Sequence, residues 1–132
     1  MERYSGVMFD AIDYTEMSPL AQKFFNNNFA ILSGMYGLVF PQENITNYKL
    51  PIETKGLVKF WGSQITEYIN EQQYDVVIDL LPKSYQKMIQ WDQLNAKRIQ
   101  VQFLTEKNGK TVLMAHGVKK VKGQWIHNVC EQ

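Results

Sequence analysis

The chain has 132 residues, a mass of 15.4 kDa and a net charge of +1, and its length indicates one domain. Hydrophobic residues make up 45%, aromatic residues 13% and charged residues 20%, which excludes a disordered tail, a collagen-like fibre and a supercharged binder. No apolar run is long enough to cross a membrane, and the first residues do not resemble a secretory signal. The one cysteine, Cys130, suits a reducing compartment, so we expect a cytoplasmic protein.

The first predicted element is a helix that begins with Ser18 as N-cap and Pro19 at the first helical position. We expect Gly34 to end this helix in a left-handed conformation. A short strand over Met35–Phe40 follows, and residues 42–54 are typical of a turn and an extended loop. The apolar face of the helix is predicted to comprise Leu20, Phe24, Phe25, Phe29, Ala30 and Leu32.

A second helix is predicted over Gly56–Gln72, because apolar residues recur there at spacings of three and four. Residues Tyr74–Leu81 then predict a buried strand rich in β-branched side chains, ended by Pro82. A short helix over Lys83–Gln90 is also compatible with the sequence. The apolar face of the second helix comprises Leu57, Phe60, Trp61, Ile65, Tyr68 and Ile69.

The last third of the chain predicts a hairpin and a helix. Ile99, Val101 and Phe103 alternate with polar residues, which favours a half-buried strand. Asn108-Gly109 is a strong hairpin turn signal, and Thr111–His116 is expected to return as the partner strand. A final helix is predicted over Val118–Val129, with an apolar stripe formed by Val118, Val121, Trp125 and Val129.

Gly123 lies inside this last helix, where it costs about 1 kcal/mol relative to alanine, so we expect a packing reason for it. Together the elements predict an α+β or mixed α/β fold. We expect a single domain over residues 1–132 with a small sheet, a β-hairpin near the C-terminus and three main helices.

Charge is divided unevenly along the chain. Residues 1–82 carry a net charge of −5, whereas residues 83–122 carry nine basic side chains against two acidic ones, a net charge of +7. On the last helix Lys119 and Lys122 share one edge and Lys120 and His127 share another. Such a surface could neutralise phosphates with little base reading. The alternative is a solvated basic face beside an acidic one, and spacing alone favours it.

The run from Ser33 to Gly37 is similar to a glycine-rich ligand loop. It follows a predicted helix, however, whereas a phosphate-binding loop follows a strand and opens a helix. On local grounds the run is a helix C-cap and a tight turn.

Candidate metal ligands and nucleophiles are few. His127 and Cys130 are three residues apart, with His116 upstream and Glu131 adjacent, but structural zinc needs four ligands at defined spacings. Cys130 could pair with His127, and Ser84 with either histidine, although neither lies in a motif that activates a nucleophile. The residues alone therefore identify no reaction, and we expect no metal or cofactor.

Two carboxylates flank the predicted strand over Tyr74–Leu81. Asp75 and Asp79 are four residues apart, which places both side chains on the same side of the strand. They could form a carboxylate pair, and strand-end capping explains them equally well.

Several short motifs change the interpretation when they are taken together. L-S-G-M-Y-G stands at Leu32–Gly37, F-W-G-S-Q-I-T at Phe60–Thr66 and E-K-N-G-K at Glu106–Lys110, with K-K-V-K-G at Lys119–Gly123. In this order and spacing, the motifs resemble the peroxide stress protein YaaA family. The resemblance covers nearly all of the chain, but the N-terminal and C-terminal segments of the family have no counterpart. The chain therefore resembles the middle of the family fold.

The chain also departs from the family pattern. Lys49 and Lys122 stand where the family usually has arginine, Phe40 replaces an arginine before the proline, and His127 stands where a further arginine is common. Lysine keeps the positive charge but loses the planar fork of a guanidinium. A role that needs only positive charge is therefore the one expected to survive.

The resemblance implies a YaaA-like domain that binds double-stranded DNA or another polyanion and protects against peroxide by limiting damaging free iron. It implies phosphate contacts from a lysine-rich cleft formed by Lys49, Lys119, Lys120 and Lys122. The wall of that cleft would comprise Ser33, Gly34, Tyr36, Gly37 and Tyr48.

An alternative is a small-molecule binder or enzyme with a pocket built from Ser33–Gly37, Tyr48-Lys49 and Ser84-Tyr85. Whether the chain is an enzyme is left open, with binding favoured over catalysis. Because the chain matches only the middle of the family, we also expect exposed apolar surface or strand edges. Such surface is covered either by a second copy in a homodimer, which we favour, or by a separate partner that supplies the missing segments.

Overall fold

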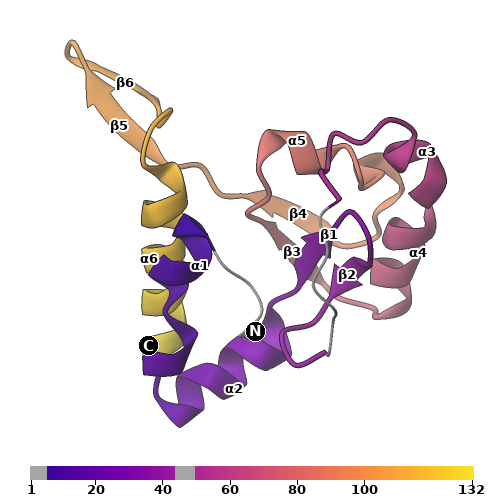
Figure 1. Cartoon of the computed structure of the whole chain (residues 1–132), viewed down its shortest axis with the longest axis horizontal. Coiled ribbons are helices and arrows are strands. Elements are labelled where there is room, and N and C mark those ends of the chain that lie inside the picture. Colours follow the sequence, from indigo (N-terminus) through magenta and orange to yellow (C-terminus); the bar gives the residue numbers. More distant parts are fainter. Residues whose placement is uncertain (1–5, 44–49) are drawn as a thin grey trace. The chain divides into compact units, whose positions relative to one another are not determined.

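A computed structural model describes residues 6–43 and 50–132 of the chain (Figure 1). The fold is mixed α/β, as predicted, with six α-helices and three two-stranded sheets in this described part. The chain divides into two compact units. Unit 1 takes in the described residues of Met1–Ala30, Phe40–Asn47 and Gln102–Gln132, and unit 2 those of Ile31–Val39 and Tyr48–Val101. The single domain expected over the whole chain stays a prediction.

Unit 1 is mainly helical. Its α-helices are α1 (Val7–Ile12), α2 (Pro19–Asn28) and α6 (Val118–Glu131), and a 3₁₀ turn, η1 (Tyr14–Glu16), separates the first two. Strands β5 (Leu104–Lys107) and β6 (Lys110–Leu113) form an antiparallel hairpin that leads into α6. Figure 1 shows α1 lying along α6, with which it makes the most extensive packing contact of the unit.

Helix α2 begins as the sequence predicts and ends earlier. The Ser18 side chain caps it by accepting a hydrogen bond from the Ala21 N–H at 3.2 Å. The helix ends at Asn28 because three successive asparagines are poor helix formers and Phe29 turns to extended backbone, where its ring stacks on Phe25. The prediction that Gly34 ends this helix is therefore wrong. So is most of the predicted apolar face, since only Ala21 and Phe25 of the helix are buried and Leu20 is 81% exposed.

Unit 2 combines two small sheets with short helices. Strands β1 (Ile31–Ser33) and β2 (Gly37–Val39) form an antiparallel hairpin, so the predicted strand over Met35–Phe40 is partly a turn. The helix predicted over Gly56–Gln72 is broken at Gly62, whose φ is 52°. It forms α3 (Leu57–Trp61) and α4 (Gln64–Glu71) instead.

The second sheet of unit 2 is a parallel pair. Strands β3 (Val76–Asp79) and β4 (Lys97–Gln100) are joined by a connection that contains α5 (Lys83–Gln86) and a 3₁₀ turn, η2 (Trp91–Gln93). The prediction of a buried strand is wrong for the outer face, since Val76 and Ile78 are exposed. Only the inner face packs on the core of the unit, which comprises Leu32, Ile52, Leu57, Ile65, Ile69, Met88 and Ile89.

The strand predicted around Ile99–Phe103 splits between the two units. Its first part is β4, which pairs with β3, and the hairpin strand β5 starts only at Leu104. The turn at Asn108-Gly109 is confirmed, with both residues at positive φ, although β6 ends at Leu113 rather than His116. The final helix is confirmed as α6.

Candidate nucleic-acid interface

The basic residues of the segment 83–122 are shared between the two units. Lys83, Lys87, Lys97 and Arg98 belong to unit 2, and the remaining five lysines belong to unit 1. The lysines of unit 1 lie on the hairpin and at the start of α6, at positions 107, 110, 119, 120 and 122. The basic residues of one continuous sequence segment are therefore divided between two units of the structure.

The β5–β6 hairpin presents two of these lysines at its tip. Lys107 pairs directly with Lys110 across the tight turn, and both strands are exposed along their whole length. Two like charges at one cross-strand position repel each other, which an anion would relieve. At its base, the hairpin is anchored by the Phe103 ring, which packs edge-to-face on Trp125 of α6 at 6.2 Å.

Helix α6 begins with two exposed lysines in its first turn. Gly117 is the N-cap at φ 73°, and no side chain caps the free N–H groups. Lys119 and Lys120 are both exposed. The N-terminus of a helix carries a partial positive charge, so cations there are unfavourable and anions favourable. We call the exposed set Lys107, Lys110, Lys119 and Lys120 the basic surface of unit 1.

Lys122 does not belong to this surface. Its side chain is only 9% exposed and shares a buried face of α6 with Gly123, Ile126 and Cys130. The expectation that Lys119 and Lys122 project together from one edge is therefore wrong. The stripe predicted from Val118 to Val129 is also displaced, since none of its residues is buried. The helix has turned a different face to its partner because Gly123 allows an unusually close approach.

Close packing of α6 against α1 explains why position 123, inside a helix, is a glycine. A Cβ at this position would overlap the Met8 carbonyl oxygen and lie 2.7 Å from the Ala11 Cβ and 3.0 Å from the Ile12 nitrogen of α1. Nearby, His127 Nδ1 lies 2.6 Å from the Ile12 carbonyl oxygen. Glycine thus lets the two helix backbones touch, and His127 ties α6 to the end of α1.

The C-terminal end of α6 is tied to the start of α2. The backbone N–H and hydroxyl of Ser18 both donate to Glu131 Oε1, at 3.1 and 2.7 Å. These hydrogen bonds lower the pKa of Glu131. Burial, followed by the charge of Glu131, raises the pKa of the Cys130 thiol to about 11. A thiol held neutral at physiological pH is a poor nucleophile, which weakens the case for Cys130 with His127 as a catalytic pair.

The glycine-rich run forms the tight turn of the β1–β2 hairpin in unit 2. Ser33 is buried, and its hydroxyl oxygen accepts from the N–H groups of Met35 and Tyr36 at 3.2 and 3.1 Å. The Trp61 indole N–H donates to the Gly34 carbonyl oxygen at 2.9 Å. Gly37, whose φ is 75°, has no Cβ and so leaves room for the same indole ring. Two motifs that lie far apart in sequence are therefore one packed feature of the unit.

Asp79 has a different partner from the one that its spacing suggests. Its side chain is fully buried, and Oδ2 accepts from the Arg98 guanidinium at 2.7 and 3.1 Å. Oδ1 accepts from the Leu81 N–H at 2.9 Å, so the carboxylate also caps the end of β3. Arg98 stacks on Trp91 with its Cζ 3.8 Å from the ring centroid. Of the two interpretations, strand-end capping is confirmed. The local sequence around Asp79 does not predict this ion pair, because Arg98 reaches Asp79 only through the pairing of β3 with β4.

The described residues of the predicted site are divided between the two units. Lys119 and Lys120 share one surface in unit 1, whereas Ser33, Gly34, Tyr36 and Gly37 form the turn in unit 2. Tyr48 and Lys49 lie outside the described residues. Across residues 6–43 and 50–132, no three histidine, cysteine, aspartate or glutamate side chains are grouped so that they could hold a metal ion. No helix in that part is long and apolar enough to span a membrane.

These observations define a mixed α/β protein with an exposed lysine surface and a glycine-rich turn that hydrogen bonds to Ser33 and Trp61 hold in place. The family model described as "Peroxide stress protein YaaA" matches residues 1–132, and the chain belongs to this family. A UPF0246 protein of Psychrobacter cryohalolentis is 31% identical over 93% of this chain and 50% of its own length. UPF0246 proteins of Rickettsia rickettsii and Rickettsia bellii are 28% and 29% identical over 53% and 54% of their lengths. The chain thus spans about half the length of these relatives.

Proposed function

We propose that this chain is a cytoplasmic DNA-binding protein of the peroxide stress response that contacts the phosphate backbone through the basic surface of unit 1. The assignment to peroxide stress follows the family, and the DNA contact follows the charges. Lys119 and Lys120 carry the proposal, and Lys107 and Lys110 on the hairpin belong to the same unit. Lys122 is largely buried and is left out of this surface, and Lys49 remains a proposed contact outside the described residues.

The observation that carries the proposal is the placement of two lysines in the first turn of α6, where the helix dipole disfavours cations. Each cation in the first turn of a helix costs about 0.3–1 kcal/mol at low ionic strength, and a bound anion reverses that cost. The uncapped N–H groups of α6 are at the same position and donate naturally to phosphate oxygens. A solvated helix face needs no such arrangement.

The chemistry of the surface favours backbone contacts over base reading. Its charged groups are lysines, which act as flexible point charges without the planar fork that recognises guanine. Phosphate contacts of this kind give strong salt dependence and little sequence preference. Limitation of damaging free iron, which the resemblance implies, is proposed as a consequence of this protein in the cell and is tested by peroxide survival of the variants below.

Charge reversal on α6 tests the proposal. We expect Lys119→Glu with Lys120→Glu to reduce the affinity for a fluorescent 20-base-pair duplex by at least about 100-fold at 50 mM salt. Glutamate in the first turn favours the helix, so this variant is expected to fold. The matched control is Lys83→Glu with Lys87→Glu in unit 2, which changes the net charge equally. Equal losses in both variants, or no loss in the α6 variant, would contradict the proposed surface.

The pocket expected around Ser33–Gly37 has less support as a ligand site. The Ser33 hydroxyl oxygen accepts from N–H groups of the turn itself, and the Gly34 carbonyl oxygen accepts from Trp61. A small-molecule site at this turn, and any enzyme activity, therefore stay predictions. The homodimer expected from the sequence also stays a prediction, which sedimentation at high micromolar concentration would test.

A further inference from the structure

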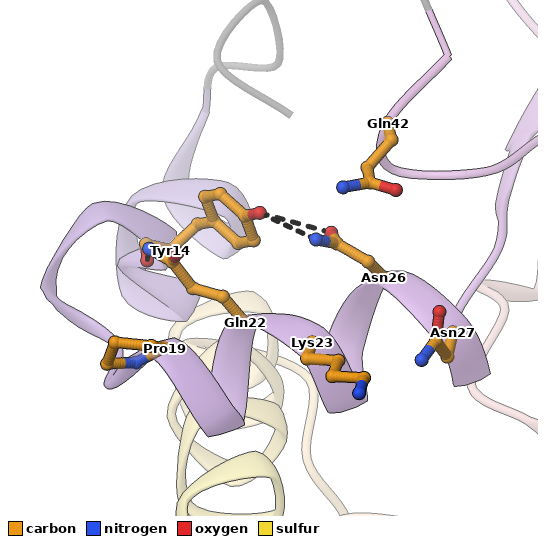
Figure 2. A pocket seen from close by; sticks show the side chains of 7 residues that line it. All are labelled: Tyr14, Pro19, Gln22, Lys23, Asn26, Asn27 and Gln42. Carbon is orange, nitrogen blue, oxygen red and sulfur yellow. Dashed lines mark hydrogen bonds between the residues drawn. The ribbon is translucent and has the colours of Figure 1, made fainter.

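One face of α2 forms the floor of an open polar depression in unit 1. Figure 2 shows the seven residues that line it, and the volume is about 420 Å³. That volume lies within the roughly 300–1,000 Å³ of small-molecule sites. Five of the residues follow the helical repeat along α2, and the opposite face of the helix is buried through Ala21 and Phe25. The lining comprises Tyr14, Pro19, Gln22, Lys23, Asn26, Asn27 and Gln42.

Hydrogen bonds hold part of this wall in place before any ligand arrives. The Tyr14 hydroxyl and the Asn26 carboxamide contact each other, with Asn26 Nδ2 2.9 Å and Oδ1 3.1 Å from the hydroxyl oxygen (Figure 2). Gln22 Nε2 donates to the Tyr14 carbonyl oxygen at 2.9 Å. Because a fixed side chain loses little entropy on binding, this wall is pre-organised.

The remaining polar groups of the depression are available to a ligand. Within the described part of the chain, the side chains of Lys23, Asn27 and Gln42 make no hydrogen bond or ion pair. Four of the lining side chains are carboxamides, which each present a donor beside an acceptor. Lys23 is the single charged group, and the lining contains no carboxylate. The depression therefore fits an anionic ligand that also carries neutral groups able to donate and accept hydrogen bonds.

A second depression, in unit 2, has the opposite charge. It is lined by polar side chains that include Glu67 and Asp92 and contains no cation. Carboxamides line both depressions, and a cation in place of carboxylates distinguishes the one in unit 1.

We infer that the depression on α2 binds a mononucleotide, with Lys23 on the phosphate and the carboxamides of Asn27 and Gln42 on the edge of the base. Asparagine and glutamine match the adjacent donor and acceptor of adenine, which makes adenosine monophosphate the best probe. The lining is polar and open, so the affinity is expected near 0.1–1 mM, about the weak end of specific sites. This inference does not depend on the DNA-binding proposal.

Nuclear magnetic resonance titration tests the site. Adenosine monophosphate should shift the side-chain amide signals of Asn26, Asn27 and Gln42 in a saturable manner. Lys23→Gln should weaken its binding by about tenfold or more, as expected for one charge-assisted hydrogen bond, and leave adenosine binding unchanged. Asn27→Ala, which raises helix propensity and so preserves α2, should weaken both ligands. The control Lys87→Gln removes the same charge from unit 2 and should change neither.

Three outcomes would overturn the inference. One is the absence of these shifts at 10 mM adenosine monophosphate, about tenfold above the weakest affinity expected. Another is equal binding of adenosine and adenosine monophosphate, which would remove Lys23 from the site. The last is binding of ribose 5-phosphate as tight as that of the nucleotide, because the base would then contribute nothing. Lys23→Gln should also leave duplex DNA affinity within about twofold, which separates this site from the basic surface of unit 1.

Discussion

Unit 1 and unit 2 are stabilised by different kinds of contact. Unit 2 surrounds a cluster of seven buried apolar residues, and its buried polar groups are tied by near-ideal hydrogen bonds such as Asp79 to Arg98. Unit 1 depends on one close helix contact at Gly123 and on polar ties between residues more than a hundred positions apart. The charged surface proposed to bind DNA lies on unit 1. Because their contacts differ, the two units should lose stability through different kinds of substitution.

The strongest test of this comparison is the buried ion pair of unit 2. Asp79→Ala should lower the free energy of unfolding by about 3 kcal/mol, because it leaves the Arg98 guanidinium and the Leu81 N–H without their acceptor. Urea unfolding followed by tryptophan fluorescence measures the loss. The control Asp75→Ala removes an exposed carboxylate beside the same strand and should change stability by less than about 0.5 kcal/mol. Similar losses in the two variants would show that the ion pair does not stabilise unit 2.

The helix contact of unit 1 gives the next largest effect. Gly123→Ala should cost about 2 kcal/mol, since overlap with the α1 backbone outweighs the gain in helix propensity. Hydrogen exchange should show the loss in α1 and α6 before unit 2. The neighbouring Gln124→Ala, at an exposed position of the same helix, serves as control and should be neutral or slightly stabilising. Uniform loss of protection in both units would break the comparison.

The glycine turn of unit 2 should respond more weakly. Ser33→Ala removes an acceptor for two backbone N–H groups and should cost about 1 kcal/mol. Ser63→Ala, which removes an exposed hydroxyl that bonds Glu67, is the matched control and should have a smaller effect. Thermal unfolding distinguishes the two. If Ser33→Ala were as mild as its control, the turn would not be fixed by this hydroxyl.

The smallest effect is a pH dependence at the tie between α2 and α6. Folding lowers the pKa of Glu131 through the Ser18 hydrogen bonds, so the tie stabilises the fold above the ordinary value of 4.5 and is lost as the pH falls through the lowered pKa. The melting temperature of Glu131→Gln should therefore lie below that of the wild type at pH 6 and converge with it near pH 3. Glu106→Gln, on the exposed hairpin, should show no such convergence. A difference that stays constant with pH would contradict the tie.

Local signals predicted the elements, and contacts distant in sequence decided their roles. The Ser18 cap, the Asn108-Gly109 turn and the extent of α6 follow from short-range chemistry and are confirmed. The sequence indicates that Gly123 needs a packing reason, but it does not indicate the partner. That partner is α1, which lies over a hundred residues earlier in the chain. The same limit applies to Lys122, which is buried on α6 beside Gly123. For the candidate site, the sequence predicted Lys119 and Lys120, which belong to unit 1, and the turn at Ser33–Gly37, which belongs to unit 2.

The salt dependence of duplex binding tests the basic surface of unit 1 most directly. Each phosphate neutralised by a lysine adds about −0.9 to the slope of log affinity against log salt concentration. We predict that Lys119→Gln with Lys120→Gln makes this slope about 2 units less steep between about 50 and 200 mM salt, whereas Lys83→Gln with Lys87→Gln leaves it unchanged. An unchanged slope in the α6 variant, or an equal change in both, would contradict the claim that unit 1 carries the DNA contact.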